Sequence, residues 1–281
     1  MTTIFDGKIF AKEEKEDLKN KVIGLSEKGI KPCLASVYLS SDPGSVLYTR
    51  LKGQAAEEIG IKFLSFEIKS NNNVSEIVSI VERLNKDESV QGILVQKPSG
   101  VNDFDSADWA KITLSISPKK DIDCLTPENL GLLLIGKPRF IPATVMAVLK
   151  VLKSSKVEFH NKNVVLIGAS EILGKPLSHI LTDMGSTVSL LHRKTGDISK
   201  YTKEADILIS ATGEPGIIGK DLIKDNSVVI DVGAPNGDVR TQEVLGKVSF
   251  LSPVPGGVGP MTINCLLENL INSLIEKGKS S

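Results

Sequence analysis

The sequence predicts an α/β fold built from two halves with mainly parallel sheets. Short runs rich in aliphatic and β-branched residues alternate with stretches of helical periodicity along all 281 residues. A connector with two prolines, residues 136–145, separates two such series. We therefore expect one domain over residues 1–140, completed by a C-terminal helix over 262–281, and a second domain over 141–261.

The first half is expected to form a β-α-β-α-β unit. Its strands are predicted over 32–39, 61–68 and 90–96, and its helices over 45–60 and 74–84. Four apolar residues recur at every fourth position of the first helix and predict its buried face: Leu47, Leu51, Ala55 and Ile59. Gly60 is a suitable stop for this helix, and Asn73 is expected to cap the next one.

The second half is expected to contain five strands, preceded by a helix over 145–152. The predicted strands cover residues 164–169, 187–192, 206–213, 227–233 and 248–254. An amphipathic helix is predicted over 261–277 at the end of the chain. Because a helix with so many apolar residues needs a partner surface, we expect it to pack on the first half.

Composition narrows the class of protein. The chain has 34 basic and 34 acidic residues, so its charge gives no reason to expect a nucleic-acid or membrane partner. Its N-terminal residues do not have the pattern of a signal peptide. The three cysteines are far apart, which fits a reducing cytoplasm, and the histidines lack the spacing of metal ligands. We expect a cytoplasmic protein without a metal.

A glycine turn after the first strand of the second half indicates a dinucleotide site. The strand leads into GASEILGKP, with Gly168, Ser170 and Gly174 between the strand and a predicted helix. The turn is one residue longer than the usual G-x-G-x-x-G, and Ser170 holds the position of its second glycine. Backbone N–H groups and a helix N-terminus would still face a phosphate, although such a turn also occurs for structural reasons alone.

The end of the next strand favours NADP over NAD. NAD sites usually place a carboxylate there, to bind the 2′-hydroxyl of the ribose. This chain instead has His192, Arg193, Lys194 and Thr195. Two cations would neutralise a 2′-phosphate, which an arginine binds through two hydrogen bonds. A solvated basic turn is the alternative.

Candidate catalytic residues occur in the first half. Tyr48 and Lys52 are four residues apart and share one helix face. Lys52 either extends to solvent or is a partly desolvated amine with a lowered pKa. Gln96 ends an apolar strand, where ligand-binding groups gather in α/β sheets. Asp121 and Asp123 alternate, so that one is expected to face a cleft and the other solvent; a salt-bridged loop is the alternative.

Together these residues resemble the methylenetetrahydrofolate dehydrogenase/cyclohydrolase family. The matching motifs are S-x-x-Y-x-x-x-K from Ser45, GILVQ, K-D-x-D, the glycine turn, VIDVG and PVPGGVGPMT at 253–262. The resemblance covers nearly the whole chain. It implies two α/β domains flanking a cleft, the second a Rossmann-type NADP-binding domain, and a homodimer that binds tetrahydrofolate derivatives. The implied reactions are NADP-dependent oxidation of 5,10-methylenetetrahydrofolate and hydrolysis of the methenyl product to 10-formyltetrahydrofolate, in one-carbon metabolism and purine biosynthesis.

The resemblance also implies the site residues. The implied catalytic residues are Lys52, Gln96 and Asp123. The same three residues would bind the substrate together with Tyr48, Gly257 and Val258. The implied cofactor-binding residues are Ser45, Thr144, Gly168, Ala169, Ser170, Gly174, His192, Arg193, Lys194, Thr195, Gly213, Gly233 and Ala234. Ser170 and Arg193 would hold the 2′-phosphate.

Four departures from the family pattern leave alternatives open. They are Lys97-Pro98-Ser99-Gly100 in place of LPLP, Cys124 in place of glycine, Ala143-Thr144-Val145 in place of Cys-Thr-Pro, and Ala234-Pro235 in place of Ile-Asn. The first alternative is a dehydrogenase that has lost the cyclohydrolase. The others are an NADP dehydrogenase acting on another substrate, such as a shikimate-like acid, and a nucleotide-sensing or scaffold protein without catalysis.

Overall fold

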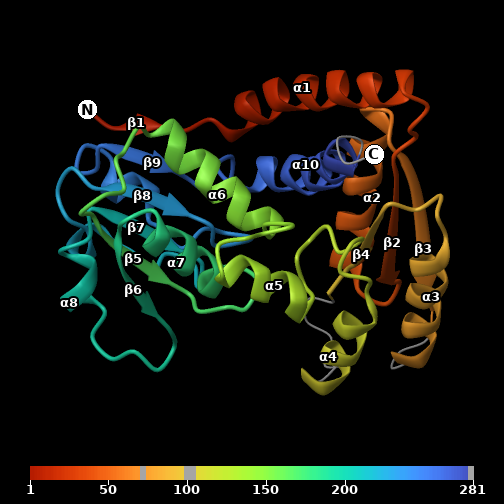
Figure 1. Cartoon of the computed structure of the whole chain (residues 1–281). Coiled ribbons are helices and arrows are strands. Elements are labelled where there is room, and N and C mark those ends of the chain that lie inside the picture. The colour runs from red at the N-terminus through yellow and green to blue at the C-terminus, as the bar shows by residue number, and fades with distance from the viewer. Residues whose placement is uncertain (70–73, 98–105, 278–281) are drawn as a thin grey trace. The chain divides into compact units, whose positions relative to one another are not determined.

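The computed structural model describes residues 1–69, 74–97 and 106–277 (Figure 1). They form two compact units. The three-stranded unit comprises residues 13–141 and 266–277, and the six-stranded unit comprises residues 1–12 and 142–265. None of the described helices is long and apolar enough to cross a membrane.

A parallel sheet of order β3-β2-β4 forms the centre of the three-stranded unit (Figure 1). Its strands are β2 (Cys33–Leu39), β3 (Lys62–Ile68) and β4 (Gly92–Val95), as the sequence predicts. The helices after these strands are α2 (Pro43–Glu58), α3 (Val74–Lys86), α4 (Ser106–Ser115) and α5 (Pro127–Leu134). The expected cap Asn73 lies outside the described residues. Side chains of β2 and β4 pack against Ile77 and Val81 of α3, forming the core of the unit.

Helix α2 buries a different face from the one that its sequence predicts. Leu47 and Leu51 are 44% and 38% exposed, so the prediction that they face the core is wrong. The buried residues of α2 are small: Ser45, Thr49, Gly53 and Ala56. A Cβ atom at Gly53 would lie 2.8 Å from the ring of Phe63 on β3. The helix lies too close to the sheet for leucine, and small residues allow that approach.

The six-stranded unit contains one parallel sheet of order β1-β9-β8-β7-β5-β6. Five of its strands were predicted: β5 (Asn163–Ile167), β6 (Thr187–Leu191), β7 (Ile207–Ser210), β8 (Val228–Asp231) and β9 (Phe250–Ser252). The sixth, β1 (Thr3–Ile4), pairs with β9, so the first residues belong to this sheet and not to the domain over residues 1–140 that the sequence predicts. The helices are α6 (Ala143–Ser154), α7 (Gly174–Asp183), α8 (Ser199–Thr202), the 3₁₀ helix η1 (Lys220–Leu222) and α9 (Thr241–Val244).

Two long helices contribute residues to both units. Helix α1 (Gly7–Glu27) was not predicted, although Leu18, Val22 and Leu25 form a buried stripe along it. The predicted terminal helix is α10 (Gly259–Lys277). The Nδ2 of Asn269 donates to the carbonyl groups of Ile122 and Ile141, each at 2.8 Å. The end of α10 therefore packs on the first half of the chain, as expected.

Candidate functional site

Lys52 and Gln96 form the centre of the candidate site in the three-stranded unit. Lys52 lies on α2 and Gln96 directly follows β4; both side chains are half-buried. The Nζ of Lys52 donates to the Oε1 of Gln96 at 2.8 Å. The ammonium group therefore bonds a protein acceptor, which answers the alternative that it only extends into solvent.

Burial lowers the pKa of Lys52 below its usual value, and the negative charge of Asp123 partly opposes this shift. A lower pKa increases the fraction of neutral amine near neutral pH. The neutral amine accepts a proton, and its ammonium form returns one. Lys52 therefore has the chemistry of a general acid and base.

Lys97, the first departure from the family pattern, is not a cause of this shift. Its Nζ lies 5.3 Å from the centroid of the Trp109 ring, in a cation–π contact. Burial and Asp123 are the causes that act on the Lys52 pKa. The rest of this departure, Pro98-Ser99-Gly100, lies outside the described residues.

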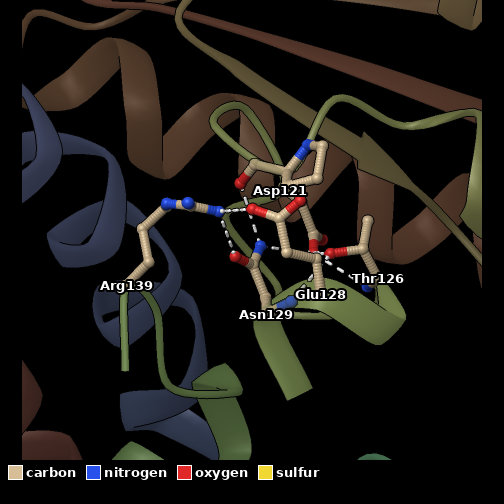
Figure 2. Close-up of polar contacts among 6 residues, drawn as sticks. Asp121, Thr126, Glu128, Asn129 and Arg139 are labelled. Atoms are coloured by element: carbon tan, nitrogen blue, oxygen red, sulfur yellow. Dashed lines mark hydrogen bonds and ion pairs between the residues drawn. The ribbon is translucent and has the colours of Figure 1, made fainter. Parts of the chain in front are cut away.

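Asp121 and Asp123 have different surroundings, but the expectation that one of them faces solvent is wrong for Asp121. Asp121 is 1% exposed, and its carboxylate accepts from the backbone N–H groups of Leu125 and Thr126. It also accepts from the Thr126 hydroxyl and the Asn129 amide, each at 2.8 Å (Figure 2). Asp123 is half-buried. These contacts of Asp121 fix the segment that carries Asp123, so the role of Asp121 is structural.

Arg139 extends this network on its outer side. It donates to the Oε1 of Glu128 at 2.8 Å and to the Oδ1 of Asn129 at 2.7 Å (Figure 2). The side chain of Asn129 is thus bonded from both ends, since its Nδ2 donates to Asp121. Helix α5 therefore holds the segment before it by side-chain hydrogen bonds as well as by its cap at Thr126.

Cys124 adopts a left-handed backbone conformation, with φ of 56°. This conformation favours glycine, the residue that the family pattern has here. The Cys124 side chain is fully buried, and burial next to Asp121 and Asp123 raises the pKa of its thiol. The backbone therefore follows a path that suits glycine, with a cysteine in its place.

Cys124→Val is expected to lower the free energy of unfolding by about 2 kcal/mol, because a β-branched residue is strained at positive φ. Cys124→Gly is expected to change it by less than about 1 kcal/mol, since relief of strain offsets the lost side-chain packing. Urea unfolding of the three proteins checks this. Equal stability of the valine variant and the parent would contradict it.

Two further predicted residues lie on α2. Tyr48 is 49% exposed and stands one turn before Lys52. Ser45 is 1% exposed, and both its backbone N–H and its hydroxyl donate to Asp42, the N-cap of the helix. The Ser45 hydroxyl thus contributes to the start of the helix.

A cleft of about 930 Å³ opens in the six-stranded unit. Seven of the predicted cofactor-binding residues line it: Gly168, Ala169, Ser170, His192, Arg193, Lys194 and Thr195. Further lining residues, which the sequence motifs do not include, follow β6 and β7: Gly196, Ile198, Ala211, Thr212, Glu214 and Ile217. Their signal was the position after a parallel strand, where ligands bind in open α/β sheets.

The glycine turn leaves no room for side chains at two positions. Gly168 has φ of 118°, and a Cβ atom there would lie 2.4 Å from the carbonyl oxygen of Ala211. A Cβ atom at Gly174 would lie 1.8 Å from the carbonyl oxygen of Gly168. Helix α7 begins at Gly174, directly after the cleft-lining turn. The longer turn therefore leads from the cleft-lining residues Gly168 to Ser170 into a helix start, as the fingerprint does, although Gly174 itself does not line the cleft.

The basic turn after β6 is held by its own hydrogen bonds. The N–H of His192 donates to the Thr195 hydroxyl at 3.0 Å, and the N–H of Lys194 donates to the His192 Nδ1 at 3.1 Å. The Arg193 side chain is 86% exposed. The cleft thus has the glycine turn and the two cations that a dinucleotide with a 2′-phosphate requires, so its residues fit NADP.

The remaining predicted cofactor residues do not line this cleft. Thr144 lies at the start of α6, Gly174 at the start of α7, and Gly213 in the loop after β7 with φ of 71°. Gly233 and Ala234 follow β8, and the Ala234–Pro235 peptide is cis. A Cβ atom at Gly233 would lie 1.9 Å from a carboxylate oxygen of Asp238, so glycine is required there.

Two buried carboxylates, which the sequence analysis missed, hold the loops after β7 and β8. Asp231 accepts from the backbone N–H groups of Gly233, Asp238 and Val239. Burial raises the pKa of Asp231, against the effect of these hydrogen bonds. Asp238 accepts from the Ser210 hydroxyl and from the N–H of Thr212, each at 2.7 Å. These contacts join both loops to the core of the unit.

The Pro-Gly loop, residues 253–258 of the PVPGGVGPMT motif, packs against the first turn of α1. The N–H of Gly7 donates to the carbonyl oxygen of Gly256 at 2.7 Å, and a Cβ atom at Gly7 would lie 1.9 Å from the Gly257 oxygen. Gly257 and Val258 are both buried. A Cβ atom at Gly257 would itself lie 2.4 Å from the carbonyl oxygen of Pro253, so Gly7 and Gly257 allow a close backbone approach here.

Comparisons with known proteins agree on one family. Residues 5–123 match the catalytic domain of tetrahydrofolate dehydrogenase/cyclohydrolase, and residues 142–278 match its NAD(P)-binding domain. The Bifunctional protein FolD of Agathobacter rectalis is 41% identical, over 98% of this chain and 99% of its own.

Two solved structures have the same fold. The bifunctional methylenetetrahydrofolate dehydrogenase/cyclohydrolase of Campylobacter jejuni is 40% identical, with a TM-score of 0.93 over 99% of this chain and 100% of its own. The Trypanosoma brucei enzyme, solved with NADP and an inhibitor, is 32% identical, with a TM-score of 0.91 over 100% of this chain and 99% of its own. This chain belongs to the tetrahydrofolate dehydrogenase/cyclohydrolase family.

Proposed function

We propose that this chain oxidises 5,10-methylenetetrahydrofolate with NADP and hydrolyses the methenyl product to 10-formyltetrahydrofolate. The observation that carries the hydrolytic step is the hydrogen bond between Lys52 and Gln96, in which a half-buried amine with a lowered pKa is held by an amide. The cleft with the glycine turn and basic turn supports NADP binding.

In the hydrolytic step Lys52 moves the proton. Its neutral amine accepts a proton from the attacking water, and the ammonium then supplies that proton to N5 as the bond between N5 and the bridging carbon breaks. The remaining hydroxyl proton passes to solvent as the formyl carbonyl forms. Gln96 orients Nζ through Oε1, which accepts one of its hydrogen bonds. Asp123 binds the amino-pyrimidine edge of the pterin, and its negative charge keeps the Lys52 pKa from falling further. Tyr48 stacks on the aminobenzoyl ring through its exposed face.

In the oxidative step the chain mainly supplies position. Bound NADP supplies the hydride acceptor for this step. Ser170, Arg193 and Lys194, which line the cleft, would hold its 2′-phosphate, and the glycine turn before α7 would lie near the pyrophosphate. By the family resemblance, Gly257 and Val258 would approach the folate and the nicotinamide closely, and the absence of a side chain at Gly257 suits this role.

The alternative of a dehydrogenase without cyclohydrolase rested on the departures near Gln96 and Asp123. Lys97 contacts Trp109 and leaves the bond between Lys52 and Gln96 intact. Cys124 adopts the backbone conformation expected of the family's glycine. Both observations favour retention of the hydrolytic step, as do relatives that are named bifunctional.

The wider setting of the enzyme follows from the family and from the thiols. We assign folate binding to residues 1–140 with the helix over 262–281, and NADP binding to residues 141–261. We further assign the protein to the cytoplasm, as a homodimer that supplies one-carbon units to purine biosynthesis. The three cysteines are buried and no disulfide joins them in the described part of the chain, which supports a reducing compartment.

An absorbance assay with methylenetetrahydrofolate and NADP tests the proposal. NADPH and the methenyl compound are followed together. NADPH formation without lasting methenyl accumulation, beyond the rate of spontaneous hydrolysis, is expected. NADPH matched by lasting methenyl accumulation would mean a dehydrogenase alone. Absence of NADPH formation would refute the folate assignment.

A further inference from the structure

Glu214 places a negative charge in the cleft that carries the basic turn. It lines the cleft together with His192, Arg193 and Lys194, and it is the acidic residue among the described residues that do so. Its Oε1 lies 3.9 Å from the Nε of Arg193. The two side chains are 53% and 86% exposed, so solvent screens this ion pair.

The backbone of Glu214 is anchored to the core of the six-stranded unit. Asp238 is fully buried and accepts from the N–H of Thr212 at 2.7 Å. The hydroxyl of Thr212 in turn accepts from the N–H of Glu214 at 3.0 Å. Two successive hydrogen bonds therefore fix the backbone of Glu214 at the cleft. The carboxylate extends from this fixed position beside Arg193.

A carboxylate in this position acts differently on the two nicotinamide dinucleotides. The 2′-phosphate of NADP carries between one and two negative charges near neutral pH, whereas NAD has an uncharged hydroxyl in its place. The phosphate must displace Glu214 from Arg193 and then remain near a like charge. The binding of NAD neither breaks the ion pair nor brings a like charge near Glu214, because NAD does not require the guanidinium group.

We propose that Glu214 is a specificity-determining residue that weakens the binding of NADP relative to NAD. It pairs with Arg193 in the free protein and gives it up when the 2′-phosphate binds. The inference rests on the proposed position of that phosphate at Arg193 and Lys194. It predicts that the chain discriminates less between the two dinucleotides than its basic turn alone would allow.

Glu214→Gln tests this by isothermal titration with NADP and with NAD, without folate. The Kd for NADP is expected to fall about two- to fivefold, the size typical of an exposed charge pair, while the Kd for NAD stays within about twofold. The gain is expected to shrink at high salt. Glu243→Gln is the matched control, because Glu243 forms a similar exposed pair with Arg240 at 3.5 Å but does not line the cleft.

The double variant Arg193→Ala/Glu214→Gln separates the inference from its basis. If Glu214 acts through Arg193, its replacement changes NADP binding by less than about twofold in the Arg193→Ala protein. An unchanged or raised Kd for NADP in Glu214→Gln, or an equal fall for both dinucleotides, would overturn the inference alone. A Kd for NADP that Arg193→Ala leaves unchanged would overturn the position of the 2′-phosphate and the inference with it.

Discussion

Lys52→Met is expected to slow methenyltetrahydrofolate hydrolysis at least about 100-fold, while NADPH formation continues and the methenyl compound accumulates. Methionine fills a similar volume but neither accepts nor donates the proton, and it leaves the Oε1 of Gln96 without its partner. Two absorbance signals, NADPH and the methenyl compound, measure the two steps in one cuvette. The ratio of the two rates gives the effect without reference to protein concentration.

Lys52→Arg sharpens this test, because arginine keeps the positive charge but does not release a proton near neutral pH. The Lys52→Arg protein is expected to hydrolyse the methenyl compound as slowly as the Lys52→Met protein. Lys86→Met is the control, since Lys86 is an exposed lysine at the end of α3. If Lys52→Arg hydrolyses at the parent rate, Lys52 acts through its charge alone and not as a general base.

The hydrolytic rate of the parent protein should also depend on pH. Because burial lowers the pKa of Lys52, the neutral amine forms at a lower pH than for an exposed lysine. Hydrolysis is therefore expected to rise with pH and to level off below the usual pKa of lysine. Spontaneous hydrolysis is subtracted at each pH. The same rise in Lys52→Met would show that another group titrates.

Arg193→Ala is expected to raise the Kd for NADP about 10- to 100-fold and to change that for NAD by less than about twofold. A guanidinium group forms paired hydrogen bonds with a phosphate, each stronger than a bond between neutral groups. The Kd for NADP of Arg193→Lys should lie between those of the parent protein and Arg193→Ala, because lysine keeps the charge and loses the paired hydrogen bonds. Titration calorimetry of both variants measures this.

The control for Arg193→Ala is Arg83→Ala, which removes an exposed arginine from α3, outside the dinucleotide cleft. It should leave both dissociation constants unchanged. If Arg193→Ala weakened NADP and NAD to the same extent, the residue would bind a group that the two molecules share, such as the pyrophosphate.

The strands were predictable because most are short apolar runs that are buried in parallel sheets. The buried face of α2 was not predictable. Hydrophobic periodicity assigns the leucines to the core, whereas the sheet leaves space only for small residues such as Gly53. Helix α1 was missed because charged residues surround its short buried stripe. Strand β1 has two residues and depends on a partner almost 250 positions away.

The candidate site divides in a similar way. Gln96 and Arg193 were predictable, because both follow a parallel strand at the edge where ligands bind. Asp238 was not, since its position depends on hydrogen bonds with Ser210 and Thr212, which are distant in sequence. The contacts of Asp121 likewise depend on the folded turn before α5, whereas the pattern K-D-x-D shows only that the two aspartates alternate.

Each unit contains one end of the chain together with a distant segment, and this limits how the enzyme can be divided into separate recombinant pieces. The chain passes from the six-stranded unit to the other unit and back, and ends in the three-stranded unit. A recombinant piece starting at residue 142 would lack the edge strand β1, and one ending at residue 141 would lack the apolar end of α10. Neither unit is a contiguous stretch of sequence, so insertions, deletions and swaps between relatives must respect both termini at once.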